Sequence, residues 1–177
     1  MQFERQSIPD VILIKPTIYG DDRGYFSETF RQDLLDKELS TPINFIQDNE
    51  SKSSKGVLRG LHYQLPPYAQ TKLVRVIEGC VLDVAVDIRK DSPTFGQHIA
   101  IELNAENKHQ LLIPQGFAHG FVVVSDTATF AYKVDNYYAP DYERGIAFDD
   151  KSLNIDWRLP IGELKLSDRD KSYKPFN

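Results

Sequence analysis

The stretch from Lys72 to Ile88, KLVRVIEGCVLDVAVDI, decides the fold class of this 177-residue chain. A turn signal at Glu78-Gly79 divides it into two short runs that are rich in β-branched residues. In the second run, Asp83 and Asp87 lie on the face opposite to an apolar set, which is Leu82, Val84, Val86 and Ile88. Such alternation with a period of two is typical of strands that have one buried face. The stretch therefore predicts two consecutive β-strands.

The pattern continues on both sides of this stretch. Further short β-type runs, separated by turn residues, cover 11–14, 25–30, 43–49, 97–103, 109–114, 119–125 and 127–134. Residues 31–39 (RQDLLDKEL) are the best helix candidate, and Ser40-Thr41-Pro42 ends it. Many short strands with turns between them predict a mainly all-β fold, an antiparallel sandwich or barrel with one short helix.

Composition restricts the classes of function. The net charge of −5 argues against general binding to nucleic acid or to anionic membranes. The single cysteine, Cys80, excludes an internal disulfide and predicts a buried structural thiol. The N-terminal residues are mixed polar, and no apolar run approaches the roughly 20 residues that span a bilayer. We therefore expect no signal peptide, no membrane partner and a cytoplasmic location.

Chemically active side chains are concentrated between Gly56 and Lys72. Arg59 and Lys72 can hold an anion, and the His62 imidazole titrates closest to neutral pH. Two cations around a possible base predict a site for a charged substrate that loses a proton. A surface loop with solvated charges is the alternative interpretation.

Two glycine-containing segments resemble the motifs of the cupin superfamily, which has a jelly-roll or double-stranded β-helix barrel. The second motif, PxGxxH, is matched by Pro114, Gly116 and His119. The first is matched in part, because Gln64 stands where a metal-binding cupin has the second histidine of HxH. Two histidines without a carboxylate partner make a poor metal site, so we predict none.

A more specific resemblance extends over nearly the whole chain. The segments DRGYFSE (22–28), QDN (47–49), GVLRGLHYQ (56–64), DIR (87–89), SPTFG (92–96), PQGFAHGF (114–121) and YYAP (137–140) with Glu143 occur in one order. In this set and order they resemble the dTDP-4-dehydrorhamnose 3,5-epimerase family. The resemblance implies one domain over 1–177, with N-terminal strands and a helix in 1–50, a jelly-roll core in 51–138, and a C-terminal segment in 139–177 that packs on the barrel.

The resemblance also implies an activity. Members epimerise dTDP-4-dehydro-6-deoxy-D-glucose at C3 and C5 to dTDP-4-dehydro-L-rhamnose, without metal or organic cofactor. The family is a homodimer that exchanges N-terminal segments between subunits. We therefore expect a small-molecule nucleotide-sugar substrate, no cofactor and a homodimer.

Catalytic roles follow from the same resemblance. His62 matches the base, and an imidazole has a reference pKa of about 6.5. Tyr132 matches the acid that returns a proton on the opposite face of the sugar, and Lys72 matches the cation that stabilises the enolate. Asp170 best matches the carboxylate that orients His62, with Asp168 and Asp83 as alternatives.

The remaining matched positions are expected to contact substrate. Arginines suit the diphosphate, Phe26 and Phe121 are expected to wall the sugar pocket, and Tyr138 is expected to stack on thymine. The full set is Arg23, Phe26, Glu28, Gln47, Asp48, Asn49, Arg59, Lys72, His119, Phe121, Tyr138, Glu143 and Arg169.

Other functions remain open at the level of sequence. Within the family, the alternatives are an epimerase that acts at C3 or C5 only, and a 3,4-ketoisomerase. From other classes, a non-catalytic nucleotide-sugar-binding jelly roll or a metal-dependent cupin dioxygenase would share the barrel. The combination of His62, Tyr132 and Lys72 favours an enzyme that moves protons.

Overall fold

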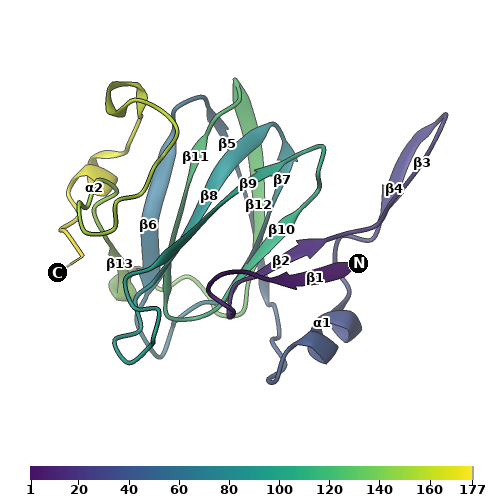
Figure 1. The fold of residues 1–177 in the computed structure, drawn as a ribbon, viewed down its shortest axis with the longest axis horizontal. Coiled ribbons are helices and arrows are strands. Elements are labelled where there is room, and N and C mark those ends of the chain that lie inside the picture. Colours follow the sequence, from purple (N-terminus) through teal and green to yellow (C-terminus); the bar gives the residue numbers. More distant parts are fainter. Residues whose placement is uncertain (177) are drawn as a thin grey trace.

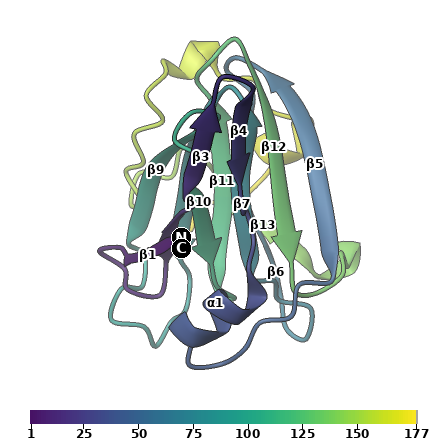
Figure 2. The same cartoon turned by 90° about the vertical axis from the view of Figure 1, so that its right-hand side faces the viewer.

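Two antiparallel β-sheets face each other in the computed structural model, which describes residues 1–176 (Figures 1 and 2). The six-stranded sheet has the order β1 (Gln2–Arg5), β2 (Ile12–Lys15), β10 (Gln110–Ile113), β7 (Lys72–Glu78), β12 (Thr127–Val134) and β5 (Gln47–Ser54). The five-stranded sheet has the order β13 (Glu143–Gly145), β6 (Leu58–Gln64), β11 (Phe117–Val123), β8 (Cys80–Asp87) and β9 (His98–Asn104).

Strands that follow one another along the chain usually belong to different sheets. β5, β7, β10 and β12 lie in one sheet, and β6, β8, β9 and β11 lie in the other. Connections that cross between two antiparallel sheets in this manner are typical of a jelly roll. The mainly all-β, cupin-type jelly-roll prediction is therefore confirmed.

The alternation of side chains in β8 produces two separate cores. Val81 and Ala85 face the space between the sheets, where they join the first core with Phe121 and Phe130. Leu82, Val84 and Val86 face outward and join a second core with Leu58, Leu61, Trp157 and others. Every residue of β11 is buried because apolar groups cover both of its faces. The two central strands thus form a rigid support for any side chain that they direct between the sheets.

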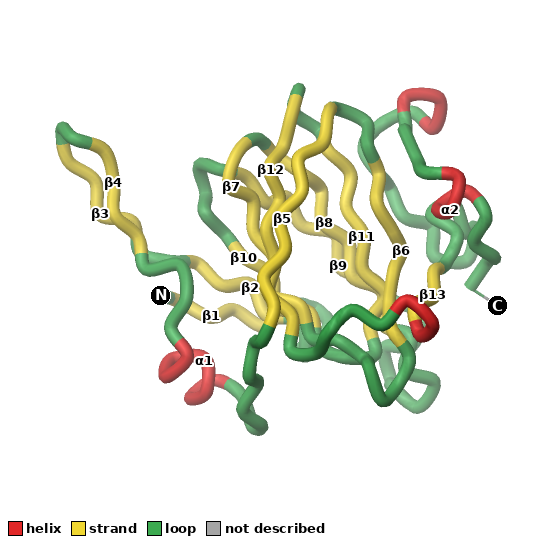
Figure 3. The backbone as a smooth tube through the Cα atoms, turned by 180° about the vertical axis from the view of Figure 1, so that it is seen from behind, coloured by secondary structure: helices red, strands yellow, loops and turns green. Residues whose placement is uncertain are grey.

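The N-terminal region combines a packed part with a projecting part. The short helix α1 (Gln32–Glu38) buries Leu35 in a third core with Ile12, Ile14 and Leu73. In contrast, the hairpin of β3 (Ile18–Asp21) and β4 (Gly24–Ser27) extends away from the sandwich (Figures 1 and 3). Its aromatic side chains are exposed, with Tyr19, Tyr25 and Phe26 at 61%, 62% and 65%.

The C-terminal segment covers the outer face of the five-stranded sheet (Figure 1). It contains two 3-10 turns, η1 (Pro140–Tyr142) and η2 (Ile161–Glu163), and the short helix α2 (Asp168–Lys171). Trp157 is buried in the second core, and its indole N–H donates to the Phe148 carbonyl at 2.8 Å. The segment therefore packs on the barrel as expected. No helix among residues 1–176 is long and apolar enough to cross a membrane.

Some sequence predictions differ from the structure in detail. The strand predicted at 43–49 begins only at Gln47 and continues to Ser54, across the expected boundary at residue 50. The strand predicted at 25–30 ends at Ser27 because the chain turns toward α1 there. Cys80, expected to be buried, is half-buried at the start of β8.

Candidate active site

A cavity of about 410 Å³ opens between the two sheets. It collects side chains from strands of both sheets and from the C-terminal segment. Its lining includes nine of the residues singled out from the sequence, which are Asn49, Arg59, His62, Lys72, His119, Phe121, Tyr132, Arg169 and Asp170. Glu50, Ser51, Phe130 and Ser167 complete it. The structure thus brings together residues that are far apart in sequence.

Close backbone contact between β6 and β11 positions His62. His62 and His119 are direct cross-strand partners, and the register shifts between His119 and Phe121. At this shift a side chain at Gly60, whose φ is +136°, would place its Cβ 2.5 Å from the Gly120 Cα. Glycine at both positions therefore allows the strands to approach, and it directs two imidazoles into one cavity.

His62 and Asp170 form a dyad. His62 Nε2 lies 2.5 Å from Asp170 Oδ1, although 108 positions separate the two residues. The Ser167 hydroxyl donates to Asp170 Oδ2 at 2.9 Å and accepts from the Asp170 backbone N–H at 3.1 Å. Burial alone would raise the pKa of Asp170, but the hydrogen bonds from His62 and Ser167 and the nearby positive charge lower it.

This arrangement defines which imidazole nitrogen is available. Because Asp170 is ionised at neutral pH, it can only accept, so His62 Nε2–H donates to it. Nδ1 then carries the lone pair that can remove a proton. Of the alternative carboxylates, Asp168 is fully exposed beside Lys171, and Asp83 pairs elsewhere. The structure therefore places Asp170 against His62.

A second, more deeply buried pair lies beside the dyad. His119 Nε2–H donates to Asp83 Oδ2 at 2.9 Å, and the Asp83 side chain has no exposure. Burial lowers the pKa of His119 despite the opposing effect of Asp83, so the imidazole is neutral at pH 7. Among residues 1–176, Asp83 Oδ1 has no hydrogen-bond partner. His119 is thus fixed as a neutral contact next to the base.

Two further groups in the cavity have shifted pKa values. Burial lowers the pKa of the Lys72 ammonium to about 8, while the charges of Asp83 and Glu143 act in the opposite direction. Lys72 Nζ donates to the His62 carbonyl at 3.4 Å. Burial raises the pKa of Tyr132, so its phenol keeps its proton at neutral pH. The cavity therefore contains a proton acceptor, a cation and a proton donor.

The acceptor and the donor lie on facing walls. His62 belongs to β6 of the five-stranded sheet, and Tyr132 belongs to β12 of the six-stranded sheet. Both line the same cavity. A flat molecule held between them would have the base on one face and the acid on the other.

Charged side chains lie toward the exposed part of the site. Arg59 donates to the Ser53 hydroxyl at 3.2 Å and also lines the cavity. Arg169 forms an ion pair with Glu143, which also accepts a hydrogen bond from Tyr138 Oη at 2.6 Å. Tyr138 is 52% exposed. Glu143 thus links Tyr138 to Arg169, and two arginines line the cavity, where their forked donors suit phosphate oxygens.

Seven of the thirteen predicted contacts do not line the cavity. Tyr138 and Glu143 are two of them, and the other five belong to the hairpin region or to β5. Arg23 pairs with Asp21 at 2.5 Å in the turn of the exposed hairpin, and Glu28 pairs with Arg31 at 3.2 Å. Gln47 donates to Asn49 at 2.8 Å. Phe26, expected as a wall of the sugar pocket, instead lines a hollow of about 560 Å³ on the outer face of the six-stranded sheet, together with Glu28 and Asp48.

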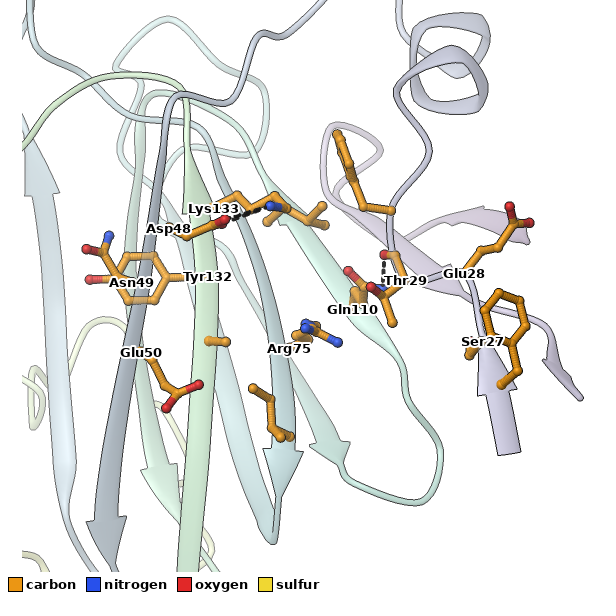
Figure 4. A pocket seen from close by; sticks show the side chains of 15 residues that line it. Ser27, Glu28, Thr29, Asp48, Asn49, Glu50, Arg75, Gln110, Tyr132 and Lys133 are labelled. Carbon is orange, nitrogen blue, oxygen red and sulfur yellow. Dashed lines mark hydrogen bonds and ion pairs between the residues drawn. The ribbon is translucent and has the colours of Figure 1, made fainter. Parts of the chain in front are cut away.

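Figure 4 shows this outer hollow between the hairpin side and β5. Asp48 pairs with Lys133 at 2.9 Å, and Gln110 donates to the Thr29 carbonyl at 2.6 Å. Asn49 and Tyr132 line both the hollow and the cavity, so the two spaces adjoin at β5 and β12. The hairpin residues of the same chain therefore lie outside the sheet and not between the sheets.

Sequence reasoning missed several residues that shape the site. Ser167 holds Asp170, and Tyr173 packs against His62. Gln64, considered only for its failure to match a metal motif, donates to the carbonyls of Tyr68 and Tyr137 and accepts from the Ala139 N–H. It thereby fixes the loop that carries Tyr138. The serine at the start of a short helix was the one available signal, because serine is a common N-cap.

Within the described part of the chain, no group of three or more His, Cys, Asp or Glu side chains is placed to hold a metal ion. Each of the two cavity histidines is instead bonded to a single aspartate.

Comparisons with known proteins agree on one family. The family model described as dTDP-4-dehydrorhamnose 3,5-epimerase matches residues 5–177. A protein of that name from Shigella flexneri is 54% identical over 176 residues, which cover 99% of this chain and 96% of the relative. A crystal structure of dTDP-6-deoxy-D-glucose-3,5-epimerase from Legionella pneumophila in complex with dTDP-4-keto-L-rhamnose is 48% identical, with a TM-score of 0.95 and coverage of 99% and 93%.

A solved structure of an enzyme named for a related reaction is also similar to this chain. A 3'-monoepimerase from Streptomyces bikiniensis in complex with dTDP-quinovose is 32% identical, with a TM-score of 0.90. The alignment covers 97% of this chain and 86% of that one. The same fold therefore occurs in proteins named for epimerisation at one carbon and at two.

Proposed function

Since this chain belongs to the dTDP-4-dehydrorhamnose 3,5-epimerase family, we propose that the cavity between its sheets performs the proton transfers of that reaction, with His62 as the base. The enzyme is an isomerase of dTDP-L-rhamnose biosynthesis that converts dTDP-4-dehydro-6-deoxy-D-glucose to dTDP-4-dehydro-L-rhamnose. The observation that carries the assignment of residues is the position of His62 and Tyr132 on facing walls of one cavity.

The first step is removal of a proton from a carbon next to the C4 ketone. His62 Nδ1 accepts this proton, and the ionised Asp170 stabilises the imidazolium that forms. The electron pair of the broken C–H bond moves toward O4, which becomes an enolate oxygen. Lys72, a buried cation in the same cavity, compensates that negative charge.

The second step restores the carbon with inverted configuration. Tyr132 donates its phenolic proton from the opposite wall, and the electron pair returns from the enolate to form the new C–H bond. Solvent then reprotonates Tyr132 and accepts the proton from His62. C3 and C5 both flank the ketone, so the same pair of groups is proposed to serve both carbons. No electron is gained or lost overall.

Binding of the nucleotide is assigned to the opening of the cavity. Tyr138 offers an exposed ring for the thymine base, and Glu143 lies beside it. Arg59 and Arg169 supply forked donors for the diphosphate. His119 and Phe121 contact the sugar from β11. Asn49, next to Tyr132 on the neighbouring strand, completes this set.

Residues outside the cavity support a homodimer. Arg23, Phe26 and Glu28 match substrate-contact positions, yet in one chain the hairpin carries them away from the cavity. Large exposed aromatic groups such as Tyr25 and Phe26 are unusual on a monomer surface. We therefore include in the proposal that the hairpin enters the site of a second subunit, where Gln47 and Asp48 lie near its entry.

Deuterium incorporation tests the function. In deuterium oxide, the enzyme is expected to label dTDP-4-keto-6-deoxyglucose at both C3 and C5, because solvent protons re-enter through Tyr132. Label at a single carbon would instead indicate a monoepimerase.

Substitution His62→Ala should reduce exchange at both carbons by about 10²–10⁴-fold. The matched control is His109→Ala, at a residue outside the cavity lining. Unchanged catalysed exchange in His62→Ala would mean that another group is the base. Exchange no faster than in buffer with the wild-type protein would favour a non-catalytic binding protein.

A further inference from the structure

We infer that Tyr173 is a positioning residue for His62, and that Gly145 provides the space in which the Tyr173 ring sits. This inference rests on the proposed role of His62 as the base. Tyr173 does not line the cavity, and no part of the mechanism above uses it. Its ring nevertheless packs edge-to-face on the His62 imidazole, with 5.6 Å between centroids and an interplanar angle of 72°.

Gly145 explains how the ring reaches this position. In the pairing of β13 with β6, Gly145 is the direct partner of His62. A Cβ built on Gly145 would lie 2.3 Å from both Cε2 and Cζ of Tyr173. Gly145 is not among the glycines with positive φ, so its backbone does not itself require glycine. The Tyr173 ring therefore fills the volume of the side chain that is missing opposite the base.

The hydroxyl of Tyr173 is buried near the charged groups of Arg169, Glu143 and Asp170. Among residues 1–176, this buried oxygen has no hydrogen-bond partner. Burial raises the pKa of Tyr173 against the opposing effect of Arg169, so the phenol stays protonated. A buried hydroxyl without a partner is a cost to stability. The part of Tyr173 that contacts His62 is the ring.

One short segment therefore constrains His62 in two ways. α2 and its N-cap Ser167 hold Asp170 against Nε2, and three residues after Asp170 the chain places Tyr173 against the ring plane. The carboxylate defines the direction of Nε2–H, while the aromatic ring restricts rotation of the imidazole. Together they hold Nδ1 toward the substrate and limit access of water to the bond between His62 and Asp170.

The test compares four variants of the full-length protein. Tyr173→Phe keeps the ring, and Tyr173→Leu removes it while filling much of its volume. Gly145→Ala displaces the ring by steric contact, and the double variant Gly145→Ala/Tyr173→Leu relieves that contact. Each is measured for kcat and KM with the dTDP-4-keto sugar and for thermal unfolding. Each is also examined by NMR for a downfield proton of the His62 Nε2–H without substrate.

We expect Tyr173→Phe to retain kcat and the downfield signal, with an unchanged or higher Tm. Tyr173→Leu should lower kcat about 10–100-fold, because a small misplacement of a catalytic group is costly, while KM changes little. Its downfield signal should broaden through exchange with water. Gly145→Ala should behave in the same way, and the double variant should be no worse than either single variant.

Three results would overturn the inference. One is a Tyr173→Leu protein that keeps both kcat and the downfield signal. Another is a loss of kcat in Tyr173→Phe as large as in Tyr173→Leu, which would give the role to the hydroxyl. The third is full additivity of the two substitutions, which would mean that Gly145 does not act through Tyr173. If the wild-type protein does not exchange deuterium into the sugar, the proposed function fails, but the NMR comparison still tests Tyr173.

Discussion

Burial of Lys72 determines the pH range in which its side chain is charged. Its pKa is lowered to about 8, so the ammonium form predominates at pH 7 and is lost as the pH rises through that value. Because the proposed enolate needs the cation, we expect kcat/KM to decline on the alkaline side with an apparent pKa near 8. Profiles of kcat/KM against pH measure this directly.

Substitution of Lys72 tests whether it is the group responsible. Lys72→Met should lower kcat by about 10²–10³-fold, the range seen when one stabilising donor is removed, and should abolish the alkaline decline. Lys133→Met is the matched control, because Lys133 lies on the outer face of the six-stranded sheet, paired with Asp48. A decline that persists in Lys72→Met would assign it to another group.

Among the site residues, the sequence identifies those that belong to a short motif or to a strand with clear alternation. Motif matches and strand parity pointed to His62, His119 and Tyr132, and the cavity contains all three. Tyr173 could not be found in this way, because its importance depends on contact with His62 across more than a hundred positions. Asp83, an alternative partner for His62, lies opposite Phe121 on β8, and its side chain reaches diagonally to His119.

The loop between β8 and β9 is organised around one buried carboxylate. Asp87 accepts hydrogen bonds from the Arg89 guanidinium and from the hydroxyls of Ser92 and Thr94, at 2.5–2.9 Å. Arg89 also pairs with Asp10 and lies 4.7 Å from the Phe117 ring centroid. Burial would raise the pKa of Asp87, but these donors lower it well below its usual range.

This network predicts the direction of an acid effect on stability. A carboxylate with a lowered folded-state pKa stabilises the protein above its unfolded pKa of about 3.9, and the contribution is lost as the pH falls below that value. We expect Asp87→Asn to reduce the free energy of unfolding at pH 7 by about 1–3 kcal/mol. The loss should be smaller at pH 3. Urea unfolding at the two pH values measures both.

Asp91→Asn provides the control for that measurement, because Asp91 is exposed in the same loop. It should leave unfolding at pH 7 nearly unchanged. Equal destabilisation by Asp87→Asn at both pH values would mean that the effect comes from packing and not from the charge.

At the element scale, strands with clear alternation were located within one or two residues, as for β7, β8 and β12. The run 43–49 was placed too early, because β5 continues through polar residues to Ser54. β5 is an edge strand whose position is set by its pairing with β12. Polar edge strands carry little apolar signal, so periodicity alone could not find its end.

At the scale of the whole molecule, the projecting hairpin leads to a prediction about how two subunits form one active site. If it completes the site of a second subunit, two defective chains should complement each other. One chain would carry His62→Ala, and the other Arg23→Ala/Phe26→Ala. In mixed dimers isolated with two affinity tags, one cavity has both a normal base and a normal hairpin, so about half of wild-type activity is expected.

Homodimers of each variant serve as controls and should both have low activity. Light scattering should give about twice the chain mass of 20.3 kDa. A mixed dimer no more active than the two controls would mean that hairpin and cavity do not combine between subunits. A mass near 20.3 kDa would contradict the dimer itself.

At this scale, the sequence predicted the two-layer β fold and the packing of the C-terminal segment, because both follow from patterns of burial. It could not show from the residues alone how far the hairpin stands from its own cavity. The hairpin is joined to α1 by the short connection 28–31, and α1 is anchored by Leu35 in the third core.

The single tryptophan makes the C-terminal segment visible to spectroscopy. Trp157 is buried in the second core, on the same stretch of chain that later delivers Asp170 and Tyr173 to His62. Emission from this one indole therefore reports whether the covering segment is in place, without contributions from any other tryptophan. Under mild denaturation, release of this segment would separate the carboxylate from the base while the central strands remain paired. Intrinsic fluorescence is thus an optical readout of catalytic competence, which a probe of β-sheet content would not provide.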